Sequence, residues 1–115
     1  MTDCIFCKIA KGEIPCEKIW EDKNFIAFAD VHPVAEGHTL IIPKKHFENI
    51  FELPSLFGNE PLDTAKEQGL RLVKEKKAEG IKLVQNNGKA AGQEVMHFHL
   101  HIIPEKSDVK REKFV

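Results

Sequence analysis

The sequence predicts a single domain of the α+β class. Five short segments show the alternating or continuous apolar pattern of β-strands, and one longer stretch repeats its apolar residues at helical spacing. A further short segment near the N-terminus can form a helical turn. With 115 residues, the chain is long enough for one hydrophobic core but not for two.

The five expected strands cover residues 17–21, 24–29, 39–43, 81–86 and 96–104. A polar turn joins the first two, and the third is continuously apolar. The fourth alternates well enough to pair with the fifth, from which a glycine-rich loop separates it. Backbone N–H groups in such a loop can approach an anion closely.

The expected helices lie at residues 4–11 and from residue 61 onward. Gly12 and Pro15 end the short helix. Pro61 suits the first turn of the long helix, and Gly80 suits its end. The apolar positions of the long helix at helical spacing are Leu62, Ala65, Gly69, Leu72 and Val73.

Charge and hydropathy exclude several classes of partner. Lys plus Arg number 17 and Asp plus Glu number 18, so no positive field is available to hold a nucleic-acid polymer. The sequence has no apolar run of about 18 residues and lacks the basic start and apolar core of a signal peptide. We therefore expect no membrane partner and a cytoplasmic location. Any bound nucleotide must be recognised in a local pocket.

The three cysteines are Cys4, Cys7 and Cys16. Their odd number, without a secretion signal, argues against a disulfide framework. Cys4 and Cys7 have the Cys-x-x-Cys spacing of half a zinc site, which needs two further ligands. Two alternatives remain open: small apolar side chains packed in the core, or a redox pair, although a redox pair normally follows a strand in a βαβ unit.

His97, His99 and His101 alternate with apolar residues in the last expected strand. Successive side chains of a strand point to opposite faces, so the three imidazoles stand on one face and Phe98 and Leu100 on the other. A merely solvated face would not need histidine at every second position. The pattern therefore indicates metal binding, phosphate chemistry or both.

The run His-x-His-x-His followed by two apolar residues resembles the signature of the histidine triad superfamily. Further motifs carry the same resemblance in the same order: DCIFCKI at 3–9, FADV at 28–31, GHTLIIPKKH at 37–46 and GQ at 92–93. The resemblance covers the chain from Cys4 to Pro104. It implies one domain at residues 1–104 with a five-stranded antiparallel sheet, one long helix and a short N-terminal helix, followed by a charged tail at 105–115. It also implies a two-fold homodimer in which two sheets join.

The resemblance supplies a metal site. Relatives that keep the Cys-x-x-Cys bind zinc with two histidines besides, and the matching residues here are Cys4, Cys7, His46 and His97. A four-coordinate site of this kind is closed and structural. Other relatives lack the cysteines and fold without metal.

The resemblance also implies a purine nucleotide site. The residue matching Asp30 holds the ribose, although Asp30 alone can equally cap the turn before Pro33. The base slot matches Phe6, Ile9, Phe28, Val31 and Leu40. The phosphate region matches Asn86, Gly92, Gln93, His99 and His101.

The implied catalyst is His99, whose neutral imidazole attacks the α-phosphorus and forms a nucleotidyl-histidine intermediate. His101 stabilises charge on the phosphate, and His38 supports the electrostatics of the site. The expected substrates are nucleoside phosphoramidates or similar derivatives of AMP or GMP. Glu94 stands where phosphoramidase relatives often carry serine. The resemblance therefore does not decide the identity of the leaving group.

Three alternatives accompany this hypothesis. The first is a dinucleoside polyphosphate hydrolase, since a triad followed by proline resembles that branch too. The second is a nucleotide-binding scaffold dimer with incidental turnover. The third is a zinc hydrolase that uses the triad as three metal ligands, which the Cys-x-x-Cys disfavours because it gives a closed site more simply.

Overall fold

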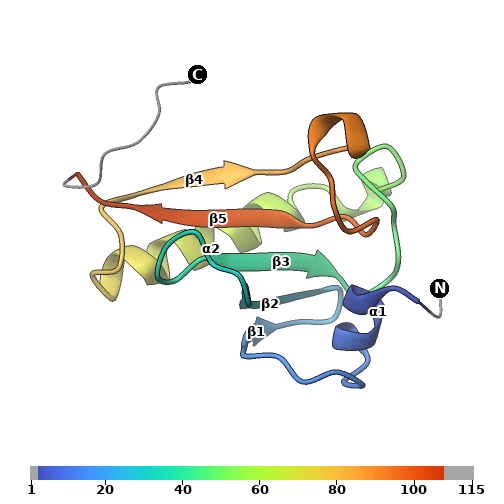
Figure 1. Cartoon of the computed structure of the whole chain (residues 1–115), viewed down its shortest axis with the longest axis horizontal. Helices are drawn as coiled ribbons and strands as arrows, with labels where there is room; N and C mark the ends of the chain where they lie inside the picture. The colour runs from blue at the N-terminus through green and yellow to red at the C-terminus, as the bar shows by residue number, and fades with distance from the viewer. Residues whose placement is uncertain (1–2, 108–115) are drawn as a thin grey trace.

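The computed structural model describes residues 3–107 and confirms the α+β class (Figure 1). Five antiparallel strands form one sheet in the order β1-β2-β3-β5-β4. The strands are β1 (Lys18–Glu21), β2 (Phe25–Ala29), β3 (Thr39–Pro43), β4 (Gly80–Val84) and β5 (Leu100–Glu105). The helices are α1 (Ile5–Ala10), α2 (Glu60–Lys74) and two short 3-10 helices, η1 (Ser55–Phe57) and η2 (Lys89–Ala91).

The two faces of the sheet bury two separate apolar clusters. Side chains alternate along each strand, so the residues that face α2 differ from those that face α1. The α2 cluster consists of Phe25, Ala27, Ile41, Ala65, Leu72, Ala78, Leu100 and Ile102. The α1 cluster consists of Phe6, Ile9, Ile26, Phe28, Leu40 and Ile42. Because Leu100 and Ile102 face α2, the intervening His101 faces the side of the sheet that carries α1.

The predicted triad strand is paired only in part. Pairing with β3 runs from Thr39 opposite Ile102 to Ile41 opposite Leu100, and two more steps would bring Pro43 opposite Phe98. Proline has no N–H to donate to a ladder, and its carbonyl is occupied by His97. The segment before Leu100 is therefore irregular, and Phe98 donates its N–H to the carbonyl of Phe47 instead.

The long helix ends earlier than the sequence predicts. Gly80 was expected to stop it, but the helix ends at Lys74 and Gly80 begins β4. Lys76 takes a left-handed φ of 62°, and the N–H of Lys77 donates to the carbonyl of Leu72. This is the bonding of a Schellman cap, formed here without glycine.

The predicted apolar stripe of α2 is only partly buried. Ala65, Gly69 and Leu72 are buried as expected, but Leu62 is 58% exposed and Val73 is 45% exposed. The structure buries the polar Thr64 and Gln68 in their place. The helix therefore covers the sheet with a narrower apolar face than the spacing suggested.

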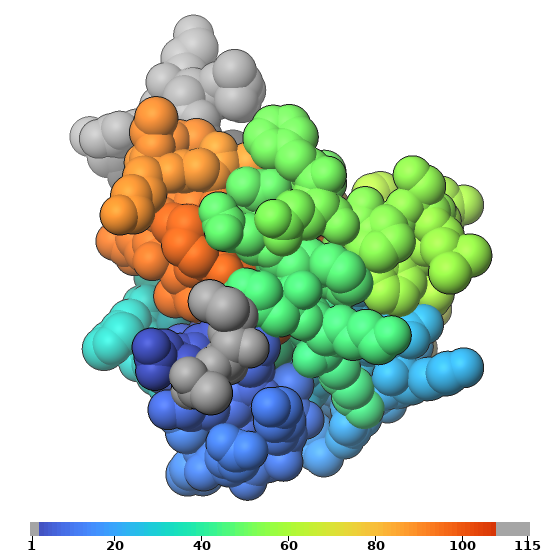
Figure 2. Space-filling view, turned by 90° about the vertical axis from the view of Figure 1, so that its right-hand side faces the viewer, coloured from blue at the N-terminus to red at the C-terminus, as the bar shows by residue number. Residues whose placement is uncertain are grey.

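The four predicted metal ligands gather at one end of the sheet. In Figure 1, α1, the end of β3, the start of β5 and the loop that follows β4 meet at the right-hand side. Figure 2 looks at this end and shows α1 below, the loop that contains η2 above and the segment that follows β3 beside them.

Within residues 3–107, no helix is long and apolar enough to cross a membrane. β5 continues through Glu105, one residue into the segment expected as a tail. The rest of that expectation falls mainly on residues 108–115, which lie outside the described part of the chain.

Candidate functional site

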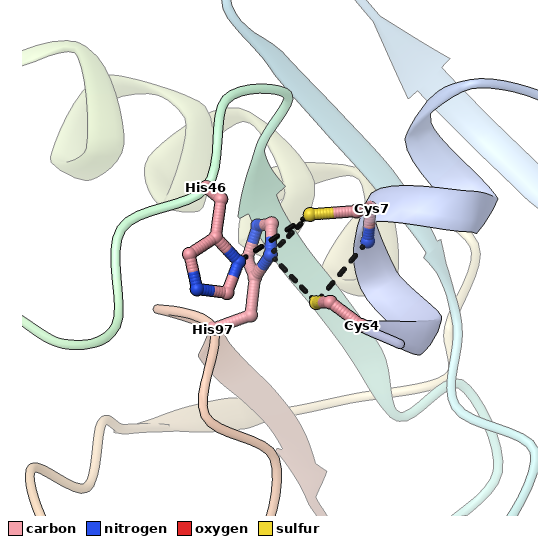
Figure 3. A group of neighbouring side chains, drawn as sticks. All are labelled: Cys4, Cys7, His46 and His97. Atoms are coloured by element: carbon pink, nitrogen blue, oxygen red, sulfur yellow. Dashed lines mark hydrogen bonds between the residues drawn. The ribbon is translucent and has the colours of Figure 1, made fainter. Parts of the chain in front are cut away.

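The structure brings together four side chains that the sequence places far apart: Cys4, Cys7, His46 and His97 (Figure 3). Cys4 and Cys7 come from the start of α1, His46 follows β3, and His97 precedes β5. Their ligand atoms all lie within 4.8 Å of one another, so the group can hold a metal ion.

The spacing of these atoms fits a tetrahedral site. The Sγ of Cys4 lies 3.2 Å from Nδ1 of His97, and the Sγ of Cys7 lies 3.3 Å from Nδ1 of His46 and 3.6 Å from Nδ1 of His97. Metal–ligand bonds of about 2.3 Å to sulfur and about 2.05 Å to nitrogen place such atoms about 3.6 Å apart. Two thiols and two imidazoles are also the ligand set of a structural zinc site.

The other ring nitrogen of His97 fixes its protonation. Nε2 lies 2.9 Å from the carbonyl oxygen of Pro43, which only accepts, so Nε2 carries the proton. Nδ1 therefore presents a lone pair to the two sulfurs. Metal-binding histidines commonly show this arrangement, in which a backbone carbonyl orients the ring.

The first turn of α1 brings the two cysteines of the Cys-x-x-Cys motif together. Cys4 is the N-cap, and its Sγ accepts the N–H of Cys7 at 3.4 Å. Burial raises the pKa of the Cys7 thiol. A bound cation opposes this effect because it stabilises the thiolate.

His99 has the tautomer that a nucleophile needs. Its Nδ1 lies 2.7 Å from the carbonyl oxygen of His97 and therefore donates a proton to it. Nε2 of the neutral ring then carries a lone pair. Nε2 has no hydrogen-bond partner in the described chain, and no buried polar side-chain atom there lacks one, so Nε2 is reachable from solvent.

His38, Asp30 and His101 form a second cluster next to His99. Nε2 of His38 lies 3.0 Å from Nδ1 of His101 and 3.3 Å from Oδ2 of Asp30. The rings of His99 and His101 are in contact, with centroids 5.0 Å apart. Burial lowers the pKa of His38, and it lowers the pKa of His101 to about 4. Both rings are therefore neutral at pH 7.

The triad histidines do not converge on one metal. Among residues 3–107, His97 belongs to the cysteine group and His101 to the cluster with His38 and Asp30, while His99 belongs to neither. The alternative of a catalytic zinc held by all three imidazoles therefore lacks its ligand geometry.

Four of the five residues expected to line a base slot lie together. Phe6, Ile9, Phe28 and Leu40 belong to the α1 cluster, and the ring of Phe6 meets the rings of His97 and His99 at 5.8 and 5.1 Å. Val31 is 79% exposed and lies outside this cluster, so its predicted contact with the base stays a prediction.

The loop before the triad is braced from within. Gln93 is buried, and its amide accepts the N–H of Gly88 and donates to the carbonyls of Glu48 and Val95. The N–H groups of Ala91, Gly92 and Gln93 also donate inside the loop. Gly88 and Gly92 have φ of 92° and 90°, which favours glycine at both positions. The predicted nucleotide contacts of Gly92, Gln93 and Asn86 stay predictions.

Sequence reasoning missed the backbone groups of the site. The carbonyls of Pro43 and His97 and the N–H of Val34 each determine which nitrogen of a histidine carries the proton. Only Pro43 gave a usable signal, because a proline at the end of a strand leaves a carbonyl without the pairing of a ladder.

A five-stranded antiparallel sheet that carries alternating histidines beside a Cys-x-x-Cys helix defines a histidine triad protein. The chain belongs to the HIT family, because the HIT domain profile matches residues 11–108.

Known proteins resemble the chain over most of its length. It is 47% identical over 105 residues to adenosine 5'-monophosphoramidase of Saccharomyces cerevisiae, and the alignment covers 91% of this chain and 64% of that protein. It is 40% identical over 105 residues to an adenylylsulfatase of Arabidopsis thaliana, and that alignment covers 91% of this chain and 53% of that protein. The crystal structure of a HIT family protein of Bacillus anthracis superposes with a TM-score of 0.87 at 42% identity, covering 92% of this chain and 75% of that one.

Proposed function

We propose that the protein is a nucleotide hydrolase that cleaves at the α-phosphate of a purine nucleotide through a nucleotidyl-histidine intermediate. The observation that carries the proposal is the hydrogen bond from Nδ1 of His99 to the carbonyl of His97, which leaves Nε2 as an accessible lone pair. A nucleoside phosphoramidate is the preferred substrate class, because one relative is named an adenosine 5'-monophosphoramidase.

The reaction has two displacements. Nε2 of His99 forms a bond to the α-phosphorus while the bond to the leaving group breaks, and the leaving group takes up a proton from solvent. Water then attacks the same phosphorus and loses a proton to solvent, the bond to Nε2 breaks, and neutral His99 and the nucleoside monophosphate are released. His101 stabilises the charge on the phosphate oxygens during both steps.

The nucleoside is bound by Asp30 and the apolar residues beside α1. The side chain of Asp30 is 15% exposed and its Oδ1 accepts the N–H of His32, so further lone pairs remain for two ribose hydroxyls. Phe6 and Phe28 are the aromatic members of the neighbouring cluster and offer the base an apolar wall. Few polar groups face such a wall, so AMP and GMP derivatives are both accepted.

Gln93 acts mainly as a brace of the loop, since both ends of its amide are occupied by the protein. Asn86 has a weaker attachment, a 3.4 Å hydrogen bond from its amide to the carbonyl of Gly92. Asn86 is therefore the loop side chain that can turn to a bound phosphate at least cost.

The metal of the cysteine group is zinc, bound by Cys4, Cys7, His46 and His97. When bound, it supplies a cross-link between three segments and no open position for substrate. The carbonyl that orients His99 belongs to His97, so the chain itself couples the metal site to the orientation of the nucleophile.

The protein forms a two-fold dimer through α2 and β4. Leu62, Leu70 and Val73 on α2 are 58%, 53% and 45% exposed. β4 lies at the edge of the sheet, where a second copy can extend the ladder. Leu83 of β4 is 46% exposed and adds to the apolar surface.

A substrate panel tests the function. Wild-type protein, His99→Gly and the control His32→Ala are mixed with adenosine phosphoramidate, diadenosine tetraphosphate and adenosine phosphosulfate, and product release is followed by chromatography. We expect the wild type and His32→Ala to hydrolyse the phosphoramidate fastest and His99→Gly to be inactive. Equal activity of His99→Gly contradicts the mechanism.

The panel also decides between the alternatives. Glu94 is exposed, so its carboxylate can point away from the leaving group of either substrate. Faster cleavage of diadenosine tetraphosphate than of the phosphoramidate identifies a dinucleoside polyphosphate hydrolase. Tight binding of AMP without turnover of any member identifies a nucleotide-binding dimer.

A further inference from the structure

A cavity of about 350 Å³ lies outside both histidine clusters. It is bordered by the turn between β1 and β2, the segment that follows β3, and η1 with the start of α2. These segments can be followed on the right-hand side of Figure 2. None of the histidines and none of the residues of the α1 cluster lines the cavity. It is large enough for a small molecule and separate from the metal and nucleotide sites described above.

The apolar part of the cavity lining is firmly held. Phe47 and Phe57 pack edge to face, with ring centroids 5.9 Å apart. Phe57 also packs on the fully buried Phe25, with centroids 5.1 Å apart, which anchors the lining to the α2 cluster. Pro54 and Leu56 line the cavity too, and Leu56 is 93% exposed. A planar apolar ring can pack here without any rearrangement of the core.

The polar part of the lining is mainly cationic. Lys23, Lys44 and Lys45 line the cavity together with a single carboxylate, that of Glu60. The two oxygens of Glu60 accept hydrogen bonds from Nδ2 of Asn24 at 3.0 and 3.2 Å. Glu60 is therefore engaged by an amide, and it pairs with none of the lysines within residues 3–107.

Two of the three lysines lack a counter-charge. Lys44 forms an ion pair with Glu21, which lies outside the lining. The ammonium groups of Lys23 and Lys45 form neither an ion pair nor a hydrogen bond with any residue from 3 to 107. Two uncompensated cations beside an apolar surface favour an anionic ligand over a neutral one.

A larger cavity, of about 490 Å³, does not show this excess of charge. Two of its three lysines, Lys77 and Lys82, pair with Glu75 and Glu105, and the carboxylate of Glu36 lines it as well. Its nearly balanced charges favour no particular class of ligand. The smaller cavity is therefore the one whose lining defines a ligand chemistry.

We propose that the cavity bordered by η1 is a binding site for a small aromatic anion. The ring of the ligand packs against Phe47 and Leu56, and its carboxylate, sulfonate or phosphate group lies toward Lys23 and Lys45. Lysine suits this role because its ammonium is a flexible point charge that accepts any of these oxyanions. The site is independent of the proposed function.

An NMR titration of the whole chain with 1-naphthoate tests the proposal. We expect saturable shifts of the backbone amides of residues 44–47 and 55–60, with a Kd of about 0.1–1 mM for a ligand of this size. The neutral analogue 1-naphthalenemethanol should bind at least about fivefold more weakly. A repeat with excess AMP identifies the source of the ligand. Free aromatic acids are the class if AMP leaves the naphthoate shifts unchanged, and nucleotides are the class if AMP alone shifts the same amides.

Variants of the lining separate charge from apolar packing. Lys23→Gln and Lys45→Gln should each weaken naphthoate binding by about two- to fivefold, and the double variant by about five- to twentyfold, without changing the affinity for the neutral analogue. Leu56→Asn should weaken both ligands. Lys74→Gln is the matched control, because Lys74 ends α2 outside the lining, and it should bind naphthoate as the wild type does.

Four results overturn the proposal. They are the absence of saturable shifts at residues 44–47 and 55–60, equal affinity for naphthoate and its neutral analogue, unchanged naphthoate binding by the double lysine variant, and displacement of naphthoate by AMP without any AMP-induced shift at these residues. Failure of nucleotidyl transfer to His99 leaves the proposal intact, because no histidine lines the cavity.

Discussion

Removal of the proposed zinc ion should lower the stability of the protein without unfolding it. The four ligands remain bonded to one another in its absence, since thiols can donate to Nδ1 of His97 and His46 at 3.2 and 3.3 Å. The two apolar clusters on either face of the sheet do not include His46 or His97. The destabilisation is therefore limited to the binding free energy of the ion.

The magnitude follows from mass action. Free zinc at one hundred times its dissociation constant stabilises the folded state by about 2.7 kcal/mol. A domain of this size shifts its Tm by about 4–6 °C per kcal/mol, so chelation should lower the Tm by roughly 10–16 °C.

Thermal unfolding with and without a chelator measures this difference, and elemental analysis gives the metal content. Cys7→Ser should bind less zinc and lose most of the chelator-dependent shift. Cys16→Ser is the control, because Cys16 packs beside the α1 cluster and lies outside the ligand group. A metal-free wild type with an unchanged Tm would refute the reasoning, as would an equal effect of both substitutions.

Further predictions concern pH, the core and assembly. Burial lowers the pKa of His101 to about 4, so below pH 6.5 the unfolded chain binds a proton at His101 that the folded chain does not bind. The free energy of unfolding should therefore be constant above pH 6.5 and fall toward pH 4. Urea titrations should show a less steep fall in His101→Gln. Leu72→Ala should cost about 2–5 kcal/mol because Leu72 is fully buried, whereas Leu56→Ala, at a residue 93% exposed, should cost less than about 0.5 kcal/mol in the same titrations. Val73→Glu should convert the proposed dimer to a monomer in sedimentation experiments, while Leu56→Glu, at a residue 93% exposed in η1, should not.

The sequence predicts strands better than it predicts where pairing stops. Residues 39–43 form β3 with the predicted bounds, because a continuous apolar run has no polar position at which to end. Pairing of the triad strand begins only at Leu100, since Pro43 lacks the N–H that would continue the ladder. The left-handed Lys76 that ends α2 has no local signal, because this conformation usually selects glycine.

The site was predictable where side chains carry the chemistry. The group of Cys4, Cys7, His46 and His97 was predicted from resemblance alone, and the structure places the four together. The protonation of the histidines depends on backbone carbonyl groups, which every residue possesses, and on N–H groups, which every residue except proline possesses. The positions of these groups follow from the fold and not from residue type.

The most direct test of the account is intact-mass analysis of protein quenched rapidly after mixing with adenosine phosphoramidate. The wild type should gain the mass of one adenylyl group, and His99→Gly should gain none although it still binds adenosine. An adduct of equal amount on His99→Gly, or full turnover by the wild type with no adduct at any quench time, would contradict nucleotidyl transfer through His99.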